Sequence, residues 1–144
     1  MSRYLVVTHQ TAFSPDLHRK VRELIAQDPA AEFAVLVPEA PGPTFTWEGE
    51  TVGEAKQRAE AAKTLLEETV GARVLHAAAG APEPLQAITD ELRMHPGYDI
   101  LVICTLPQGI SRWVKMDLVH QAERKFGLRV IHVVAEAPTP VRRP

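Results

Sequence analysis

The stretch that decides the fold is Tyr98–Val134, which begins YDILVICT (98–105), continues LPQGISRWVKMD (106–117) and ends in RVIHVV (129–134). The first and last of these runs are continuously apolar and rich in β-branched residues, which is typical of buried strands. Between them lie a loop containing proline and glycine and a helical segment from Gln121 to Phe126, followed by Gly127. The stretch therefore predicts a strand–helix–strand unit with parallel strands Asp99–Thr105 and Arg129–Val134.

The composition describes an ordinary globular domain. The chain has 144 residues, is 45% hydrophobic and carries a formal net charge of -2, which suits one domain with its own core. A pI near 6.3 argues against nucleic acid as a partner. No apolar run approaches the roughly 20 residues that cross a membrane, and the single cysteine suits a reducing compartment. We expect a cytoplasmic protein without membrane association.

The unit recurs upstream of the deciding stretch. Three more strands are predicted, at Tyr4–Thr8, Glu32–Val37 and Ala72–His76. Helices are predicted after Ser14-Pro15-Asp16, over about five turns ending at Gly71, and from Pro82 or Pro84. We interpret residues 1–136 as one domain and residues 137–144 as a proline-rich tail, with Phe45 and Trp47 in a long loop as a lid or, more simply, an anchor.

Five strands alternating with helices predict an α/β fold with a parallel sheet covered on both faces. The first and fourth strands are the fullest apolar runs, so we place them side by side at the centre in the order 3-2-1-4-5. The switch point, where ligands bind in such sheets, then lies between Thr8 and Cys104. The fifth strand, Arg129–Val134, becomes an apolar edge, which predicts a homodimer that pairs this strand with its copy.

The chain resembles the universal stress protein family over nearly the whole domain. The resemblance rests on the element order, the long loop after the second strand, Gly80-Ala81-Pro82-Glu83-Pro84 before the third helix, and Asp99-Ile100-Leu101-Val102-Ile103 in the fourth strand. It implies a five-stranded sheet in the order 3-2-1-4-5, dimerisation through the last strand and, in many members, ATP binding.

The sequence departs from the family at the nucleotide motif. The spacing Gly-x2-Gly-x9-Gly-Ser/Thr falls on Cys104, Pro107, Asp117 and Leu118, and the family's aspartate after the first strand falls at about Thr8 or His9. Phosphates bind to backbone N–H groups that glycines bring close at a helix N-terminus. Pro107 has no N–H, and the Asp117 carboxylate is expected to cap the last helix and repel a phosphate. We therefore expect that ATP is not bound in the family manner.

A smaller anionic ligand is the alternative for the loop after the fourth strand. In the stretch that starts at Gly109, Ser111 could cap a short helical turn, with Arg112 and Lys115 nearby to meet an anion. The competing interpretation is a solvated basic surface covered by Trp113.

The other candidate ligand-binding residues are Thr8, His9, Val37, Cys104 and Thr105, which end strands or follow them. Each also has a structural interpretation: threonine is a good strand residue, His9 an ordinary loop histidine, and Cys104 a small buried hydrophobe. The six histidines lack a paired spacing such as His-x3-His, so no metal site is predicted, and His76 and His132 are assigned to packing or to an edge.

Three classes of function compete. The first is a universal stress protein-like binding or signalling module with a degenerate nucleotide site, and it agrees best with the residues. The second is an ATP- or AMP-binding family member or a small nucleotide-dependent enzyme; the Gly-x4-Gly-Lys-Ser/Thr loop and a nucleophile–base pair are missing, so catalysis is not predicted. The third is a flavodoxin-like receiver, which would need acidic residues where Thr8, His9 and His76 stand.

Overall fold

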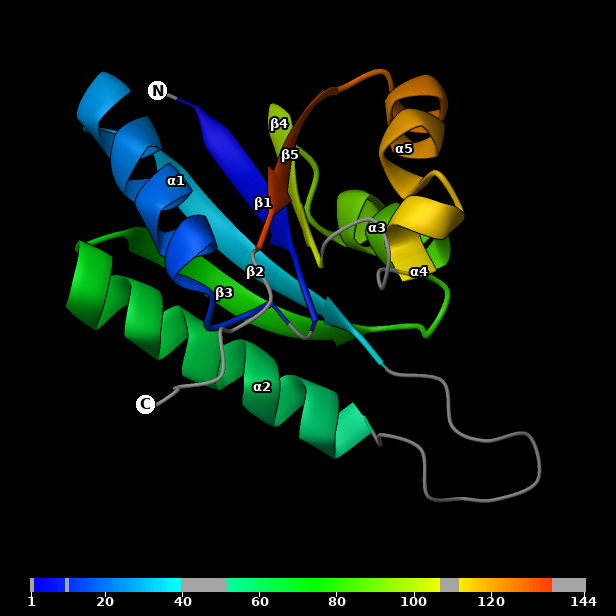
Figure 1. Ribbon diagram of the computed structural model, residues 1–144, viewed down its shortest axis with the longest axis horizontal. Helices are drawn as coiled ribbons and strands as arrows, with labels where there is room; N and C mark the ends of the chain where they lie inside the picture. The colour runs from blue at the N-terminus through cyan, green and yellow to red at the C-terminus, as the bar shows by residue number, and fades with distance from the viewer. Residues whose placement is uncertain (1, 10, 40–51, 107–111, 136–144) are drawn as a thin grey trace, which may run out of the picture.

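The computed structural model describes residues 2–9, 11–39, 52–106 and 112–135, and Figure 1 shows their arrangement. The elements follow in the order β1 (Arg3–Val7), α1 (Pro15–Gln27), β2 (Glu32–Pro38), α2 (Val52–Leu65), the π-helical turn η1 (Leu66–Val70), β3 (Arg73–Gly80), α3 (Pro84–Met94), β4 (Ile100–Thr105), α4 (Arg112–Lys115), α5 (Leu118–Phe126) and β5 (Arg129–Val134). The predicted long loop with Phe45 and Trp47 and the predicted tail 137–144 lie outside the described residues.

The strands form one parallel sheet in the order β3-β2-β1-β4-β5, as the sequence predicts. Helices α1 and α2 cover one face, and α3, α4 and α5 cover the other (Figure 1). The strand order reverses between β1 and β4, so the predicted switch point lies at the carboxyl ends of these two strands. Within the described residues, no helix has the length and apolar character needed to span a bilayer.

Helix α1 begins as its local sequence predicts. The Ser14 side chain accepts a hydrogen bond from the Asp16 N–H at 3.0 Å, and Pro15 is the first helical residue. Its apolar stripe is buried at Leu17, Val21 and Leu24. The start of α1 and its buried side could both be predicted from the sequence, because the cap and the period of 3.6 residues are properties of the local sequence.

Each face of the sheet has its own core. Beneath α1 and α2 lie strand residues that include Val6, Phe33, Val35 and Val102, against Ala55, Ala59, Ala62 and Leu66 of the second helical segment. Beneath α3 and α5 lie Leu5, Val7, Leu36, Leu101 and Ile103, against Ala87, Ile88, Leu118 and Ala122. The strands are apolar on both sides because both sides are covered.

The third strand differs from the prediction. It runs from Arg73 to Gly80 rather than ending at His76, so the predicted small-residue loop begins too early. Phe33 pairs with Val74, but Ala34 pairs with His76, which leaves Leu75 as the extra residue of a β-bulge. Alternation along a regular strand would place His76 on the same face as Val74. The bulge instead turns His76 toward α3.

Gly80 permits the close approach of α3 to the end of β3. A Cβ atom built on Gly80 would lie 2.6 Å from the Cβ of Ala87 and 3.1 Å from a methyl carbon of Leu36. Any side chain there would push the helix from the sheet. Helix α3 starts just beyond, with Pro84 as its first residue and the Glu83 carboxylate accepting from the Gln86 N–H at 2.8 Å.

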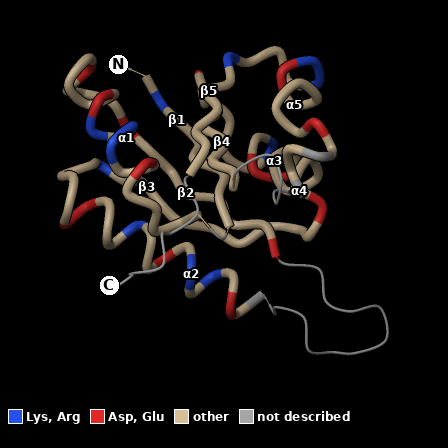
Figure 2. Tube along the Cα trace, viewed as in Figure 1, with Lys and Arg blue, Asp and Glu red and all other residues tan. Residues whose placement is uncertain are grey.

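The two edges of the sheet differ. On the β3 edge, the Lys56 ammonium of α2 donates to the Ala77 carbonyl at 2.6 Å. On the β5 edge, Val134 is 41% exposed and Ile131 partly exposed. Acidic and basic residues alternate along the helices and are nearly absent from the strands (Figure 2). Each edge strand exposes one large apolar side chain, Leu75 of β3 at 42% and Val134 of β5 at 41%, so the difference between the two edges is the lysine that covers the β3 edge.

Candidate functional site

The switch point contains a buried chain of hydrogen bonds that joins β1 to β4. The Thr11 hydroxyl donates to the Cys104 carbonyl at 3.0 Å and lies 2.6 Å from the Thr8 hydroxyl. A hydroxyl has one proton, so Thr8 is the donor to Thr11. Both threonines are at most 4% exposed. The predicted candidate Thr8 thus lies at the switch point, but its hydroxyl proton is used within the protein.

Two other candidates lie in the core. Val37 is 0% exposed and Cys104 is 1% exposed, and both belong to the core beneath α1 and α2. Burial raises the pKa of the Cys104 thiol to about 11, so the thiol is protonated at neutral pH. The side chain behaves as the small buried hydrophobe that was the alternative interpretation.

His9 follows β1 and contacts Arg58, a residue that the sequence analysis did not single out. The Arg58 guanidinium of α2 lies with Nη1 2.9 Å from His9 Nε2, and both side chains are partly buried. A guanidinium can only donate, so this nitrogen of His9 is the acceptor. Arg58 brings a permanent positive charge to the carboxyl end of β1. No sequence signal connects the two residues, because they are 49 positions apart.

Thr105, the last residue of β4, makes its contact across the sheet to β5. Its hydroxyl lies 2.8 Å from His132 Nε2, and its backbone carbonyl accepts from the Ala135 N–H at 2.7 Å. These bonds tie the end of β4 to the end of the edge strand. His132 was assigned to packing or to an edge, and it lies on the edge strand.

The loop after β4 is described only in part. Gly109 and Ser111 lie outside the described residues, and only the backbone of Arg112 and Lys115 is described, in α4. Trp113 and Met116 are partly buried and pack against the core beneath α3 and α5. Trp113 therefore covers the core, as its structural interpretation predicted.

Asp117 occupies the third glycine position of the family motif and has a left-handed backbone. Its φ of 57° is the positive value that glycine adopts most readily, and Asp117 is the one described non-glycine residue with such a value. Its carbonyl accepts from the Gln121 N–H at 3.0 Å at the start of α5. The predicted side-chain cap is wrong: in this conformation the carboxylate makes no cap hydrogen bond and instead lies 2.8 Å from His120 Nδ1.

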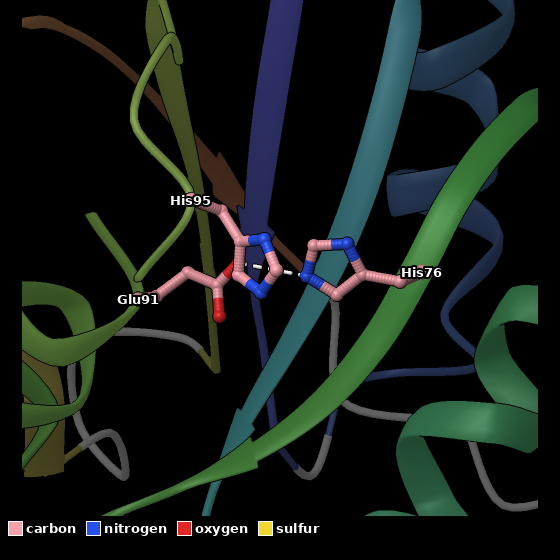
Figure 3. Close-up of side chains that lie close together, drawn as sticks. All are labelled: His76, Glu91 and His95. Atoms are coloured by element: carbon pink, nitrogen blue, oxygen red, sulfur yellow. Dashed lines mark hydrogen bonds and ion pairs between the residues drawn. The ribbon is translucent and has the colours of Figure 1, made fainter. Parts of the chain in front are cut away.

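A second group of polar residues lies away from the switch point and was missed by the sequence analysis. His76 of β3, Glu91 of α3 and His95 at the end of α3 offer ligand atoms that all lie within 4.8 Å of one another. Figure 3 shows the three side chains converging from the two elements. The spacing of Glu91 and His95, one helical turn, was available as a signal, but the bulge that turns His76 toward them was not.

The element order, the switch point and the two covered faces define a universal stress protein-like α/β fold. A solved structure described as a universal stress protein from Archaeoglobus fulgidus superposes with a TM-score of 0.61, covering 92% of this chain and 93% of the other at 19% sequence identity. No family model and no curated sequence matches the chain. The likeness establishes the fold and confirms the predicted fold class.

Proposed function

We propose that the chain is a non-enzymatic, universal stress protein-like binding module of the cytoplasm, formed by residues 1–136, whose switch point takes a small anionic ligand and does not hold ATP in the family manner. The observation that carries the proposal is Asp117. Its backbone is left-handed, the conformation that glycine adopts most readily. Its side chain adds a negative charge at the start of α5, where a phosphate would need to approach.

The buried hydrogen bonds support the same conclusion. Thr8 donates to Thr11, and Thr11 donates to the Cys104 carbonyl, so both hydroxyl protons at the switch point are already used. A polyphosphate and a sugar need several donors. Arg58 brings one permanent positive charge to this region, beside His9, which suits one anionic group.

Isothermal titration calorimetry with AMP, inorganic phosphate and MgATP tests the ligand class. We expect AMP or phosphate to bind at least as tightly as MgATP, and Arg58→Ala to weaken that binding by about tenfold or more, since a charge-assisted hydrogen bond contributes about 1.5–3 kcal/mol. Arg19→Ala, which removes an exposed cation of α1 paired with Asp16, should leave it unchanged. The double variant Arg112→Ala/Lys115→Ala tests the loop residues in the same way.

Asp117→Gly distinguishes the proposal from a nucleotide-binding module. Glycine keeps the left-handed turn and removes the carboxylate, so MgATP affinity should rise in the variant relative to the natural chain. Tight MgATP binding by the natural chain, weakened by changes near the start of α5, would contradict the proposal. Turnover of a nucleotide that is abolished in His9→Ala would favour the enzyme alternative.

We also propose a homodimer through β5. Among the described strands, β3 and β5 are the two edges, and β3 has Lys56 on its Ala77 carbonyl. The β5 edge instead presents Val134 and Ile131 to solvent. Pairing with a second copy would cover these side chains and satisfy the free backbone groups of the edge.

Light scattering coupled to gel filtration measures this directly. The natural chain should elute as a dimer at micromolar concentration, and Val134→Lys should shift it to the monomer because edge lysines oppose strand pairing. Met94→Lys is the matched control, since Met94 is also an exposed hydrophobic residue, at 73%, but lies at the end of α3. A monomeric natural chain would contradict the dimer.

A further inference from the structure

His76, Glu91 and His95 form a group of two imidazoles and one carboxylate on the α3 side of the sheet. Glu91 is buried, at 5% exposed, whereas the His76 side chain is 30% exposed and His95 is exposed. The rings of His76 and His95 lie with their centroids 4.4 Å apart, and the Glu91 carboxylate points toward both (Figure 3). The group is thus anchored in the core and open to water on one side.

Three features of the chain build this arrangement. The bulge at Leu75 turns His76 from one face of the sheet to the other. His95 is the C-cap residue of α3, four residues after Glu91, and its backbone N–H donates to the Glu91 carbonyl, which keeps the two residues close together. The Tyr98 hydroxyl donates to Glu91 Oε2 at 2.8 Å, the same oxygen that lies 2.8 Å from His76 Nε2, and so restrains the carboxylate.

We propose that this group is a binding site for a divalent transition-metal ion, with Zn²⁺ as the best match. Two imidazole nitrogens and one carboxylate oxygen are a donor set that zinc uses when a fourth position is left for water. Tetrahedral bonds of about 2.0–2.2 Å place neighbouring ligand atoms about 3.4 Å apart. The present separations, from 2.8 Å between His76 Nε2 and Glu91 Oε2 to at most 4.8 Å, bracket that value.

Two details favour a metal over a simple ion pair between His76 and Glu91. Such a pair needs no second imidazole, yet the His95 ring lies against the His76 ring, and among the described residues neither of its nitrogens makes a hydrogen bond. Tyr98 supplies the outer-shell hydrogen bond that metal-bound carboxylates commonly receive.

The site is independent of the proposed ligand site. Helix α3 runs antiparallel to the strands, so its final turn lies toward the amino end of the sheet, whereas the switch point lies at the carboxyl end. A metal ion there would join the edge strand β3 to the end of α3. It would therefore strengthen a part of the fold that the β5 dimer does not reach.

Zinc binding is measured on the full chain by calorimetry in competition with a chelator, and Co²⁺ serves as a visible-light probe of four-coordinate geometry. We expect one ion per chain. His95→Ala should lower the affinity by more than the 10- to 100-fold that loss of an outer-shell partner costs, and Tyr98→Phe by about that range. Because the His95 ring makes no hydrogen bond to a described residue, the metal-free variant should unfold at the same urea concentration as the natural chain.

His120→Ala is the matched control. His120 is an exposed histidine 2.8 Å from the Asp117 carboxylate, and no described residue adds a third ligand. It therefore reports binding to any surface histidine–carboxylate pair. Its removal should leave zinc affinity unchanged. Equal affinities of the natural chain, His95→Ala and His76→Ala, or an absence of saturable zinc and cobalt binding, would overturn the proposal.

Discussion

The Thr11 hydroxyl donates to the carbonyl of Cys104 across 93 positions of sequence, which joins the loop after β1 to the end of β4. This bond and its neighbour, from Thr8 to Thr11, hold the two central strands together at the carboxyl end of the sheet. At the buried end of the switch point, the hydroxyl protons of Thr8 and Thr11 are therefore used in hydrogen bonds within the chain.

Thr11→Val should destabilise the fold by about 1–3 kcal/mol, because it leaves the Thr8 hydroxyl and the Cys104 carbonyl without their partner in a buried place. Urea unfolding followed by circular dichroism measures the change. Thr89→Val is the control, since that hydroxyl bonds only to the Leu85 carbonyl in its own helix, and it should change stability by less than about 0.5 kcal/mol. Equal effects of the two variants would show that the link between the strands adds no stability.

Cys104 should be unreactive in the folded protein. Its pKa of about 11 leaves almost no thiolate at pH 7.5, and the side chain is 1% exposed. A chromogenic disulfide reagent should modify the native chain far more slowly than the chain unfolded in urea. Modification at the same rate in both states would contradict the burial of the thiol.

The stability of the protein should fall as the pH drops below about 6.5, in part because of His18. This side chain is 8% exposed, and its Nε2 has no hydrogen-bond partner among the described residues. Burial, and then the nearby charge of Arg22, lower the pKa of His18. Between the folded and the unfolded pKa the unfolded chain binds more protons, so stability rises with pH across that window.

His18→Leu tests the assignment. The loss of stability between pH 7.5 and pH 5.5, measured by urea unfolding at each pH, should be smaller in this variant than in the natural chain. An unchanged pH dependence in His18→Leu would assign the effect to other groups.

Gly80→Ala should destabilise the fold by about 1–3 kcal/mol through the clash with Ala87, whose Cβ lies 2.6 Å from the position of the new methyl group. The double variant with Ala87→Gly relieves the clash. The double variant should therefore lose less unfolding free energy than the sum of the losses in the two single variants, which a double-mutant cycle detects. Strict additivity would mean that β3 and α3 move apart freely at this point.

Local signals predicted the elements well. Ser14 and Pro15 place the start of α1, Gly127 ends α5 with a φ of 65°, and the alanines of α2 lie against the sheet. The continuous apolar runs of β1 and β4 placed them at the centre, since a strand that is apolar on both sides must be covered on both sides. The helix ends depend on residues within a few positions in the sequence, and the central strands are recognised because both of their faces are apolar.

The errors have one kind of cause. The predicted third strand ended at His76 because the alanines after it resemble a loop, and the bulge at Leu75 depends on pairing with β2. Asp117 was predicted to cap α5 through its carboxylate, but its left-handed backbone turns that group toward His120. In both cases a contact or backbone angle outside the local pattern decides where the side chain points.

Apolar periodicity and residue identity were enough to predict the fold class, the strand order and the departure from the family's glycine motif, because both are properties of the chain alone. The contacts of Arg58 with His9, of Thr11 with Cys104 and of two histidines with Glu91 could be found only in the folded chain. These contacts join residues on different elements, and the register and bulge of the folded sheet set the distances between them.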